Sequence, residues 1–146
     1  MFGTGRLGTV VLTRLQEQGI EAWGIDFDPI AVRRLRDMGF HARFGDGEDP
    51  DFVATLPLSE VALAISTVRL ADVELTLLQA LRDGGFEGPV ILTSETTTAA
   101  QRLQNAGATF VLLPYEAAGE RATEVIRQTL QDPTYLEEVR AEPRAP

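Results

Sequence analysis

The sequence predicts an α/β fold with a doubly wound parallel sheet, and three observations carry this prediction. Short apolar runs typical of buried strands alternate with helical patterns at intervals of roughly 20 to 25 residues, the rhythm of repeated βα units. Most of the helical patterns end at a glycine, a favourable residue just past a helix. A glycine-rich turn also stands directly before the first helical pattern, as in doubly wound nucleotide-binding sheets.

The first half of the chain predicts three helices and two strands. The first helix carries valine and leucine on one side and ends at Gly19. Asp28 and Pro29 predict the start of the second helix, because aspartate caps a helix and proline suits its first turn. The expected elements are a helix over 6–18, a strand over 20–25, a helix over 29–38, a strand over 40–44 and a short helix near 51–56.

The second half repeats this pattern. The expected elements are a buried strand over 61–65, a helix over 70–82, a strand over 89–93, a helix over 98–106, a strand over 109–113 that Pro114 ends, and a helix over 116–130. We therefore predict one domain over residues 1–130. Residues 131–146 contain three prolines and several acidic residues, and we expect them to form a polar, mostly solvated tail.

One expected element is missing from this series. A doubly wound sheet places its first strand at the centre, before the glycine-rich turn, but only Met1 and Phe2 precede Gly3. Two residues cannot form the usual strand of about five. Either residues precede Met1 in the functional polypeptide, or the fold is built around a stub; we favour the first, with Met1 not its natural start.

Composition excludes several kinds of site. The net charge of −9 disfavours nucleic acid as a partner. The basic residues are all arginine, so neither a lysine Schiff base nor a P-loop lysine is available. The chain has no cysteine and His41 as its one histidine, which leaves no thiolate or multi-histidine metal site. No apolar run approaches the roughly 18 residues of a membrane span, and the first residues do not resemble a signal peptide.

The turn Gly3-Thr4-Gly5-Arg6-Leu7-Gly8 matches the dinucleotide-binding pattern G-x-G-x-x-G. Gly3 permits the tight turn, Gly5 lets a pyrophosphate approach the backbone, and Gly8 lets the helix pack closely. The free N–H groups of the helix that follows attract phosphate. The pattern thus predicts a Rossmann-type nucleotide site over these six residues; the alternative is a glycine-rich turn that binds nothing.

Asp26 supports the first alternative. It ends the second predicted strand, where an acidic residue accepts hydrogen bonds from the adenosine ribose, and Phe27 adjoins it. A ribose 2′-phosphate would meet this carboxylate with no adjacent arginine, so NADP is disfavoured. The alternative for Asp26 is a plain turn aspartate, and Asp28 is better explained as a helix cap than as a ligand contact.

Four further positions leave two interpretations open. Asp46 either bonds the adenine or ribose or makes an Asp-Gly turn. Ser66 and Thr67 follow a strand at the point where strand order reverses, so their hydroxyls either meet the ligand or cap the next helix. Arg6 pairs with a phosphate or with an acidic neighbour. Trp23 and His41 are expected to be structural, with Trp23 packed.

A wider set of residues resembles a known family. The glycine turn with Arg6, the run Asp26-Phe-Asp-Pro29, Gly45-Asp46 and the turn Ala106-Gly-Ala108 resemble the RCK N-terminal (TrkA-N) domain, the regulator of potassium conductance. The runs Ala64-Ile-Ser-Thr67, Leu78–Leu81, Gly85–Val90 and Ala106–Pro114 look most like the copies at the cytoplasmic end of Kef-type cation:proton antiporters. The resemblance covers about residues 2 to 128.

The resemblance implies a sensor. Such domains bind NAD(H), AMP or ATP-like nucleotides, pair as homodimers and pass the bound state to a membrane cation transporter at the cytoplasmic face. By position, Gly3, Gly5, Arg6 and Gly8 would meet the phosphates, Asp26 the ribose and Asp46 the adenine side. The chain departs from the family in two places: many members carry an arginine where this chain has Thr93-Ser-Glu95, and the first strand is absent.

The leading hypothesis is therefore a non-enzymatic, nucleotide-sensing regulatory domain of a potassium or cation:proton transport system. One alternative is a small NAD-dependent oxidoreductase. Such enzymes use a proton donor such as Tyr, Lys or His, whereas lysine is absent here and Tyr115 and Tyr135 lie near the C-terminus. Another is an interaction module that keeps the fold without a cofactor.

Overall fold

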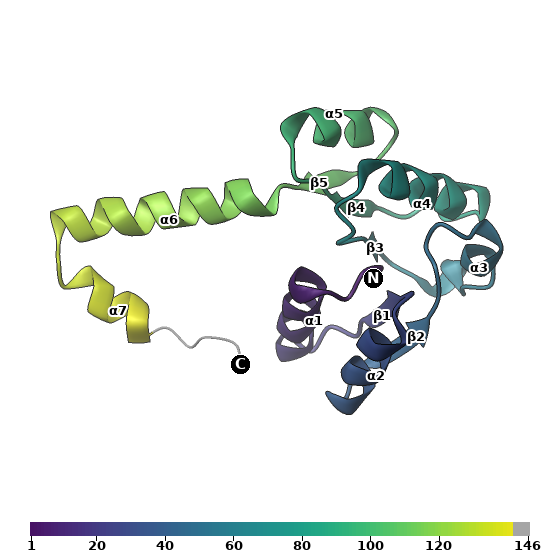
Figure 1. Cartoon of the computed structure of the whole chain (residues 1–146), viewed down its shortest axis with the longest axis horizontal. Helices are drawn as coiled ribbons and strands as arrows, with labels where there is room; N and C mark the ends of the chain where they lie inside the picture. The colour runs from purple at the N-terminus through teal and green to yellow at the C-terminus, as the bar shows by residue number, and fades with distance from the viewer. Residues whose placement is uncertain (142–146) are drawn as a thin grey trace.

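The computed structural model describes residues 1–141 as an α/β domain from which a pair of helices projects (Figure 1). The strands are β1 (Trp23–Asp26), β2 (His41–Phe44), β3 (Ala64–Ile65), β4 (Val90–Thr93) and β5 (Phe110–Leu112). The helices are α1 (Arg6–Glu17), α2 (Pro29–Asp37), α3 (Pro50–Ala54), α4 (Ala71–Asp83), α5 (Thr97–Asn105), α6 (Pro114–Gln131) and α7 (Tyr135–Ala141), with a 3-10 turn over Leu58–Glu60.

All five strands run parallel, in two groups joined through Phe2. β1 pairs with β2, and β4 lies between β3 and β5. Phe2 makes parallel bridges to Ile25 on one side and Ser66 on the other. The resulting order, β2-β1-Phe2-β3-β4-β5, is that of a Rossmann-like doubly wound sheet. The centre of this sheet is thus formed by Met1, Phe2 and Gly3, here called the stub.

Backbone hydrogen bonds hold the stub on both sides. The Phe2 N–H donates to the Ile65 carbonyl at 2.7 Å, and the Thr67 N–H donates to the Phe2 carbonyl at 2.9 Å. On the other side, the Gly3 N–H donates to the Ile25 carbonyl at 2.9 Å, and the Ile25 N–H donates to the Met1 carbonyl at 2.7 Å. Met1, Phe2 and Gly3 therefore pair with β1 and β3 as the carboxyl end of a central strand would.

Two apolar clusters form the core. The larger one includes Phe2, 5% exposed, and lies between the strands and α4 and α5. The smaller one joins α1 and α2 to β2 through Leu12, Val32, Leu35, Phe40 and Ala42. Both clusters place apolar helix faces against the sheet, which leaves the carboxyl ends of the strands for polar residues.

Two strand predictions were too long. The expected strand over 61–65 is reduced to Ala64–Ile65, and Val61 and Leu63, expected to be buried, are 36% and 39% exposed. The expected strand over 20–25 begins only at Trp23, which was expected to pack but is 51% exposed and stacks on His41 with ring centroids 4.9 Å apart. Both shortened segments lie where Met1 and Phe2 provide no strand between them.

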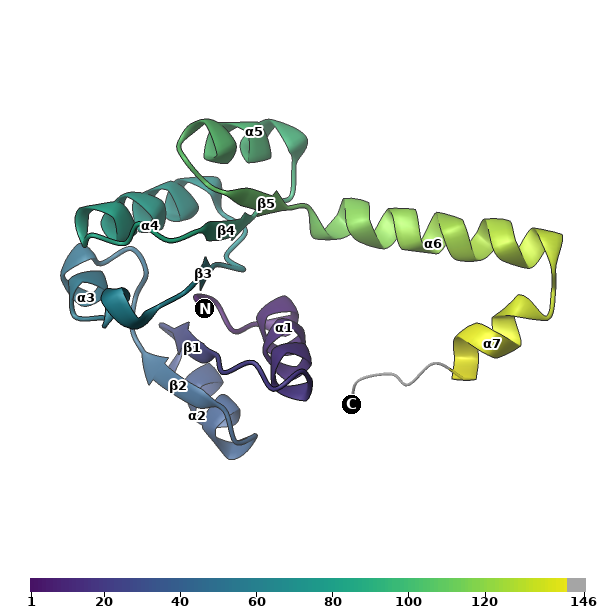
Figure 2. The ribbon, with the colours of Figure 1, turned by 180° about the vertical axis from the view of Figure 1, so that it is seen from behind.

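The C-terminal helices form an arm that leads away from the sheet (Figure 2). Pro114, expected only to end a strand, is the first residue of α6, and α6 has no buried residue. Within the segment expected to be a polar tail, residues 135–141 form α7 instead, with Tyr135 and Val139 half-buried. The rest of that tail, 142–146, lies outside the described residues.

Candidate nucleotide site

The glycine turn joins the stub to α1 and has the backbone geometry that its sequence predicts. Gly3 has φ +74°, a conformation that L side chains rarely adopt. A Cβ at Gly8 would lie 2.2 Å from the Gly3 carbonyl oxygen, so α1 packs directly on the turn. A Cβ at Gly5 would have no atom within 4 Å. The turn is therefore crowded beneath Gly3 and Gly8 and open at Gly5, where a ligand can approach.

The amino end of α1 offers unpaired donors to that opening. Gly5 is the N-cap of α1 and provides no side-chain cap. The first turn contains no acidic residue that would compete with an anion. Arg6 is exposed and forms no ion pair with an acidic residue in the described part of the chain, whereas Leu7 is half-buried. The acidic-neighbour interpretation of Arg6 is therefore wrong for this structure.

The Asp26 carboxylate already accepts three protein hydrogen bonds. Its Oδ2 accepts from the Thr4 N–H at 2.6 Å and from the Thr4 hydroxyl at 2.7 Å, and its Oδ1 accepts from the Asp28 N–H at 3.0 Å. The fold thus brings the first variable position of the glycine turn onto the acid that we expected to bind ribose. Oδ1 retains the capacity for a further donor.

An arginine also reaches the glycine turn, but it forms no ion pair with Asp26 among the described residues. Arg34 of α2 donates to the Thr4 carbonyl at 3.1 Å. Arg34 lies 30 residues from Thr4 in the sequence, so no local pattern indicated this contact. The Asp28 cap is confirmed, because its side chain accepts from the Ile30 N–H at 2.8 Å.

The second flank of the site follows β3. The Thr67 hydroxyl donates to the Gly3 carbonyl at 2.8 Å and so ties this segment to the glycine turn. The Ser66 hydroxyl oxygen accepts from the Val68 N–H at 3.3 Å. Neither caps the next helix, whose N-cap is Leu70 without a side-chain bond, so the capping interpretation is wrong.

The third flank follows β2. Asp46 accepts from the Glu48 N–H at 2.9 Å, which is the turn interpretation of this residue. A Cβ at Gly45 would lie 1.9 Å from the Phe52 ring, so close packing explains that glycine. Phe27 is 69% exposed and Phe44 is 58% exposed, which leaves two aromatic rings uncovered at the carboxyl ends of β1 and β2.

Two groups of polar residues beside the site were missed from the sequence. Arg69, Glu95 and Tyr115 follow β3, β4 and β5: Arg69 donates to Glu95 at 2.7 Å and to the Tyr115 hydroxyl at 3.3 Å. An arginine therefore reaches the exit of β4 from the neighbouring loop. Glu74 of α4 is 0% exposed and contacts Thr93 at the end of β4. These residues are far apart in the sequence, and they meet only because neighbouring parallel strands end at the same edge of the sheet.

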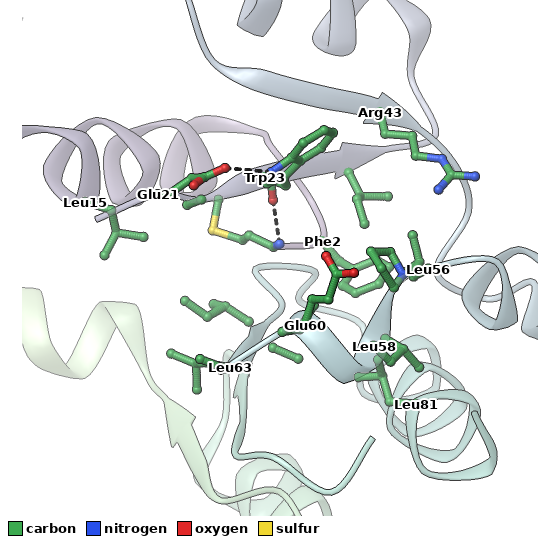
Figure 3. A pocket seen from close by; sticks show the side chains of 18 of the residues that line it. Phe2, Leu15, Glu21, Trp23, Arg43, Leu56, Leu58, Glu60, Leu63 and Leu81 are labelled. Carbon is green, nitrogen blue, oxygen red and sulfur yellow. Dashed lines mark hydrogen bonds between the residues drawn. The ribbon is translucent and has the colours of Figure 1, made fainter. Parts of the chain in front are cut away.

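A large cavity lies at the opposite ends of β1 and β3 from the glycine turn. It has a volume of about 740 Å³ and is lined mostly by apolar residues, with Trp23 and Phe2 beside Leu56, Leu58 and Leu63 (Figure 3). None of the residues that we predicted to bind nucleotide lines it. It continues the line of the stub toward the amino ends of the strands and is distinct from the candidate site.

Two kinds of feature are absent from residues 1–141. This part of the chain contains no group of three or more His, Cys, Asp or Glu placed to hold a metal ion. Among the same residues, no helix combines the length and the apolar character needed to cross a membrane.

Comparison with known proteins identifies relatives of this chain. The TrkA-N domain family matches residues 1–114. A putative K⁺ efflux antiporter, KefB, of Alkalimonas amylolytica is 28% identical over 131 residues, which cover 90% of this chain and 20% of the antiporter. The chain thus spans about a fifth of that relative's length.

Solved structures show the same fold. The NAD(P)-binding domain of an exopolyphosphatase-related protein from Archaeoglobus fulgidus has a TM-score of 0.79 at 24% identity, over 87% of this chain and 95% of that chain. The Kef CTD of Shewanella denitrificans in its AMP-bound form has a TM-score of 0.75 at 18% identity, over 96% and 85% of the two chains. The GsuK channel bound to NAD has a TM-score of 0.69 at 18% identity, over 76% and 20%.

The match to the family extends from the stub through the glycine turn and all five strands to the first residue of α6. It includes every residue that we predicted to contact a nucleotide. This chain belongs to the TrkA-N domain family.

Proposed function

We propose that this chain is a nucleotide-sensing regulatory domain of a potassium or cation:proton transport system. The observation that carries the proposal is the open approach at Gly5, where the uncapped amino end of α1 faces the space beside Asp26. Such an end attracts phosphate through its free N–H groups and its partial positive charge. The antiporter relative and the nucleotide-bound structures of similar fold support the same function.

The ligand that fits this arrangement is an adenine nucleotide, NAD(H) or AMP or ATP. Its phosphates would lie over Gly3, Thr4, Gly5 and Gly8, with Arg6 as a further partner. A ribose hydroxyl would donate to the remaining capacity of the Asp26 carboxylate. The adenine side would face Phe27 and Asp46. Solved structures of similar fold carry NAD, ADP and AMP.

We propose a regulatory role for the chain and not an enzymatic one. A hydride-transfer enzyme uses a positioned proton donor beside the cofactor. Here His41, the one histidine, stacks on Trp23 at the amino ends of the strands, away from the glycine turn. The partner that we propose is the membrane portion of a cation transporter, which would place the domain at the cytoplasmic face, paired with a second copy.

Calorimetry with NAD, AMP and NADP tests the proposal. We expect NAD and AMP to bind at least tenfold more tightly than NADP, about 1.4 kcal/mol, because the 2′-phosphate would meet the Asp26 carboxylate. Equal or tighter NADP binding would show that Arg34 outweighs Asp26. Absence of binding by all three would favour an interaction module without a cofactor. Mass spectrometry of nucleotide that co-purifies with the protein identifies the physiological ligand.

A further inference from the structure

Glu74 is a buried acidic residue, and nothing in the fold described above requires an acid at its position. The residue is 0% exposed. Its Oε1 accepts from the Thr93 N–H at 3.2 Å, and the Ser66 side chain lies beside the carboxyl group. Its Oε2 has no hydrogen-bond partner among the described residues. An unpaired buried oxygen is costly and therefore calls for an explanation.

Glu74 accepts a backbone hydrogen bond that would otherwise go to the neighbouring strand, but this role explains only part of the arrangement. In the parallel ladder, the Ser66 N–H donates to the Ile91 carbonyl at 2.8 Å. The next carbonyl along, that of Ser66, accepts from the Thr93 hydroxyl at 2.8 Å, and the Thr93 N–H turns to Glu74 instead. A glutamine would accept the same bond without a charge. The ladder thus requires an oxygen at this place but not an acid.

A short chain of contacts leads from Glu74 to the glycine turn. The Ser66 hydroxyl oxygen, which contacts the carboxyl group, accepts from the Val68 N–H at 3.3 Å. Between them, Thr67 donates to the Gly3 carbonyl through its hydroxyl and to the Phe2 carbonyl through its N–H. The segment that Ser66 holds is therefore the one that faces the phosphate-binding backbone.

We propose that Glu74 is a positioning residue for the nucleotide site, and that the gain of one proton by its carboxyl group strengthens nucleotide binding. As a carboxylate, the group accepts from the Ser66 hydroxyl. As an acid, it can donate to the Ser66 oxygen and so hold Ser66, which is itself 0% exposed, in the segment that is tied to the glycine turn. Protonation also removes a negative charge near an anionic ligand. The inference rests on the proposed nucleotide site.

The buried environment of Glu74 places the pKa of its carboxyl group near neutral pH. Burial raises the pKa of Glu74 to about 7, while the hydrogen bonds from Ser66 and Thr93 act in the opposite direction. The charged residues around it are paired or exposed at the surface: Arg69 with Glu95, Asp72 on the same helix with Arg102 of α5, and Asp51 of α3. Burial, rather than a neighbouring charge, therefore governs this proton.

The test is calorimetry with NAD on the whole chain at pH 6, 7 and 8. NAD is the suitable probe because its pyrophosphate does not titrate over this range, unlike the phosphate of AMP. We expect the affinity of the wild type to rise about fivefold or more from pH 8 to pH 6, the usual scale of a coupling between two sites. Glu74→Gln, which mimics the protonated acid, should bind equally at all three pH values.

Two control variants isolate Glu74 from other groups. Asp72→Asn changes an exposed carboxylate on the same helix and should keep the wild-type dependence on pH. His41→Gln removes the one histidine, which lies at the amino end of β2, and this variant should also keep the wild-type dependence on pH. A lost pH dependence in either control would move the effect away from Glu74.

The outcomes separate this inference from the proposed function. NAD binding that does not strengthen as the pH falls, or a dependence retained in Glu74→Gln, overturns the inference and leaves the nucleotide site standing. Absence of NAD binding at every pH overturns both. If Glu74→Gln fails to fold, NMR titration of the Glu74 carboxyl group in the wild type decides: a pKa raised by NAD supports the inference, and an unchanged one overturns it.

Discussion

Gly5 is the residue at which the nucleotide site can be tested with least effect on the fold. Its Cβ position is open, and its φ of −62° suits any L residue. Gly5→Val should therefore keep the free energy of unfolding within about 1 kcal/mol of wild type, the usual scale of an N-cap change. It should weaken nucleotide binding at least tenfold, about 1.4 kcal/mol, because the side chain occupies the path of the phosphates.

Calorimetry and chemical denaturation measure both effects. The matched control is Gly119→Ala in α6, which also meets no atom within 4 Å. It should leave nucleotide binding unchanged and raise the free energy of unfolding by up to about 1 kcal/mol, because alanine favours a helix interior more than glycine does. Unchanged affinity in folded Gly5→Val would show that the nucleotide binds elsewhere. Gly8→Ala is expected to differ from both, since its Cβ would strike the Gly3 carbonyl and destabilise the turn itself.

Glu74 also predicts how stability depends on pH. Its pKa is raised from 4.5 to about 7 in the folded chain, so the folded state keeps a proton that the unfolded state has lost. This stabilisation is complete below pH 4.5 and is lost as the pH rises through 7. It amounts to at most about 3 kcal/mol by the conversion of pKa shifts to free energy.

Chemical denaturation at pH 5 and pH 8, with wild type and Glu74→Gln side by side, measures this loss. The wild type should lose stability relative to the variant as the pH rises. The Met1 amino group, whose pKa burial lowers to about 6, acts in the opposite direction but is common to both proteins and cancels. A difference between the two proteins that is the same at both pH values would contradict the prediction.

At the scale of residues, the sequence predicted backbone roles better than side-chain partners. Gly3 and Gly8 have the turn and close packing that their pattern indicates, because those requirements are local. The bonds from Thr4 and Arg34 around Asp26 could not be predicted in the same way. They depend on how α2 and the turn meet in space, which no short pattern specifies.

At the scale of elements, helices were predicted more accurately than strands. The ends of α1, α2 and α5 depend on local caps and terminal glycines, and all three lie within two residues of expectation. β1 and β3 are shorter than expected because a strand extends only as far as its neighbour does. α7 was missed because it is only seven residues long, and its contact with α6 is tertiary.

The arm made by α6 and α7 carries the prediction of a dimer. Ile126 and Leu130 of α6 are 60% and 82% exposed, as large apolar residues on a helix with no buried face. A second copy that covered them would remove this apolar surface from water. We therefore expect the chain to self-associate at tens of micromolar, roughly the range of weak association, and Ile126→Glu with Leu130→Glu to weaken it.

Light scattering over a concentration series measures the association. Ile30→Glu is the matched control, because Ile30 is 73% exposed on α2, outside the arm. This control should associate as the wild type does. A wild-type chain that remains monomeric throughout the series would count against the dimer, and a loss of association in Ile30→Glu would place the contact on the sheet side of the molecule.

At the scale of the whole molecule, the stub and the cavity are two parts of one feature. Strand residues bond alternately to either side, and Ile25 and Ile65 both bond to the stub. The backbone groups of Trp23 and Leu63, two residues earlier in each strand, therefore face the same gap. Trp23 uses its carbonyl there, as an acceptor from the Met1 amino group at 2.6 Å.

The cavity itself makes a prediction that can be tested by adding residues. An apolar, β-branched segment of about four residues placed before Met1 should continue the stub between β1 and β3, fill the 740 Å³ cavity and cover Leu63 and Trp23. It would also replace the buried Met1 amino group with a neutral amide. With about 1 kcal/mol for each backbone hydrogen bond gained and further stabilisation from apolar burial, the free energy of unfolding should rise by about 2–4 kcal/mol.

A glycine-serine segment of equal length is the control, because it can extend the chain but cannot fill an apolar cavity. Chemical denaturation of the three proteins decides the matter: if the apolar segment stabilises the chain no more than the glycine-serine segment does, the cavity is not the unoccupied half of a central strand.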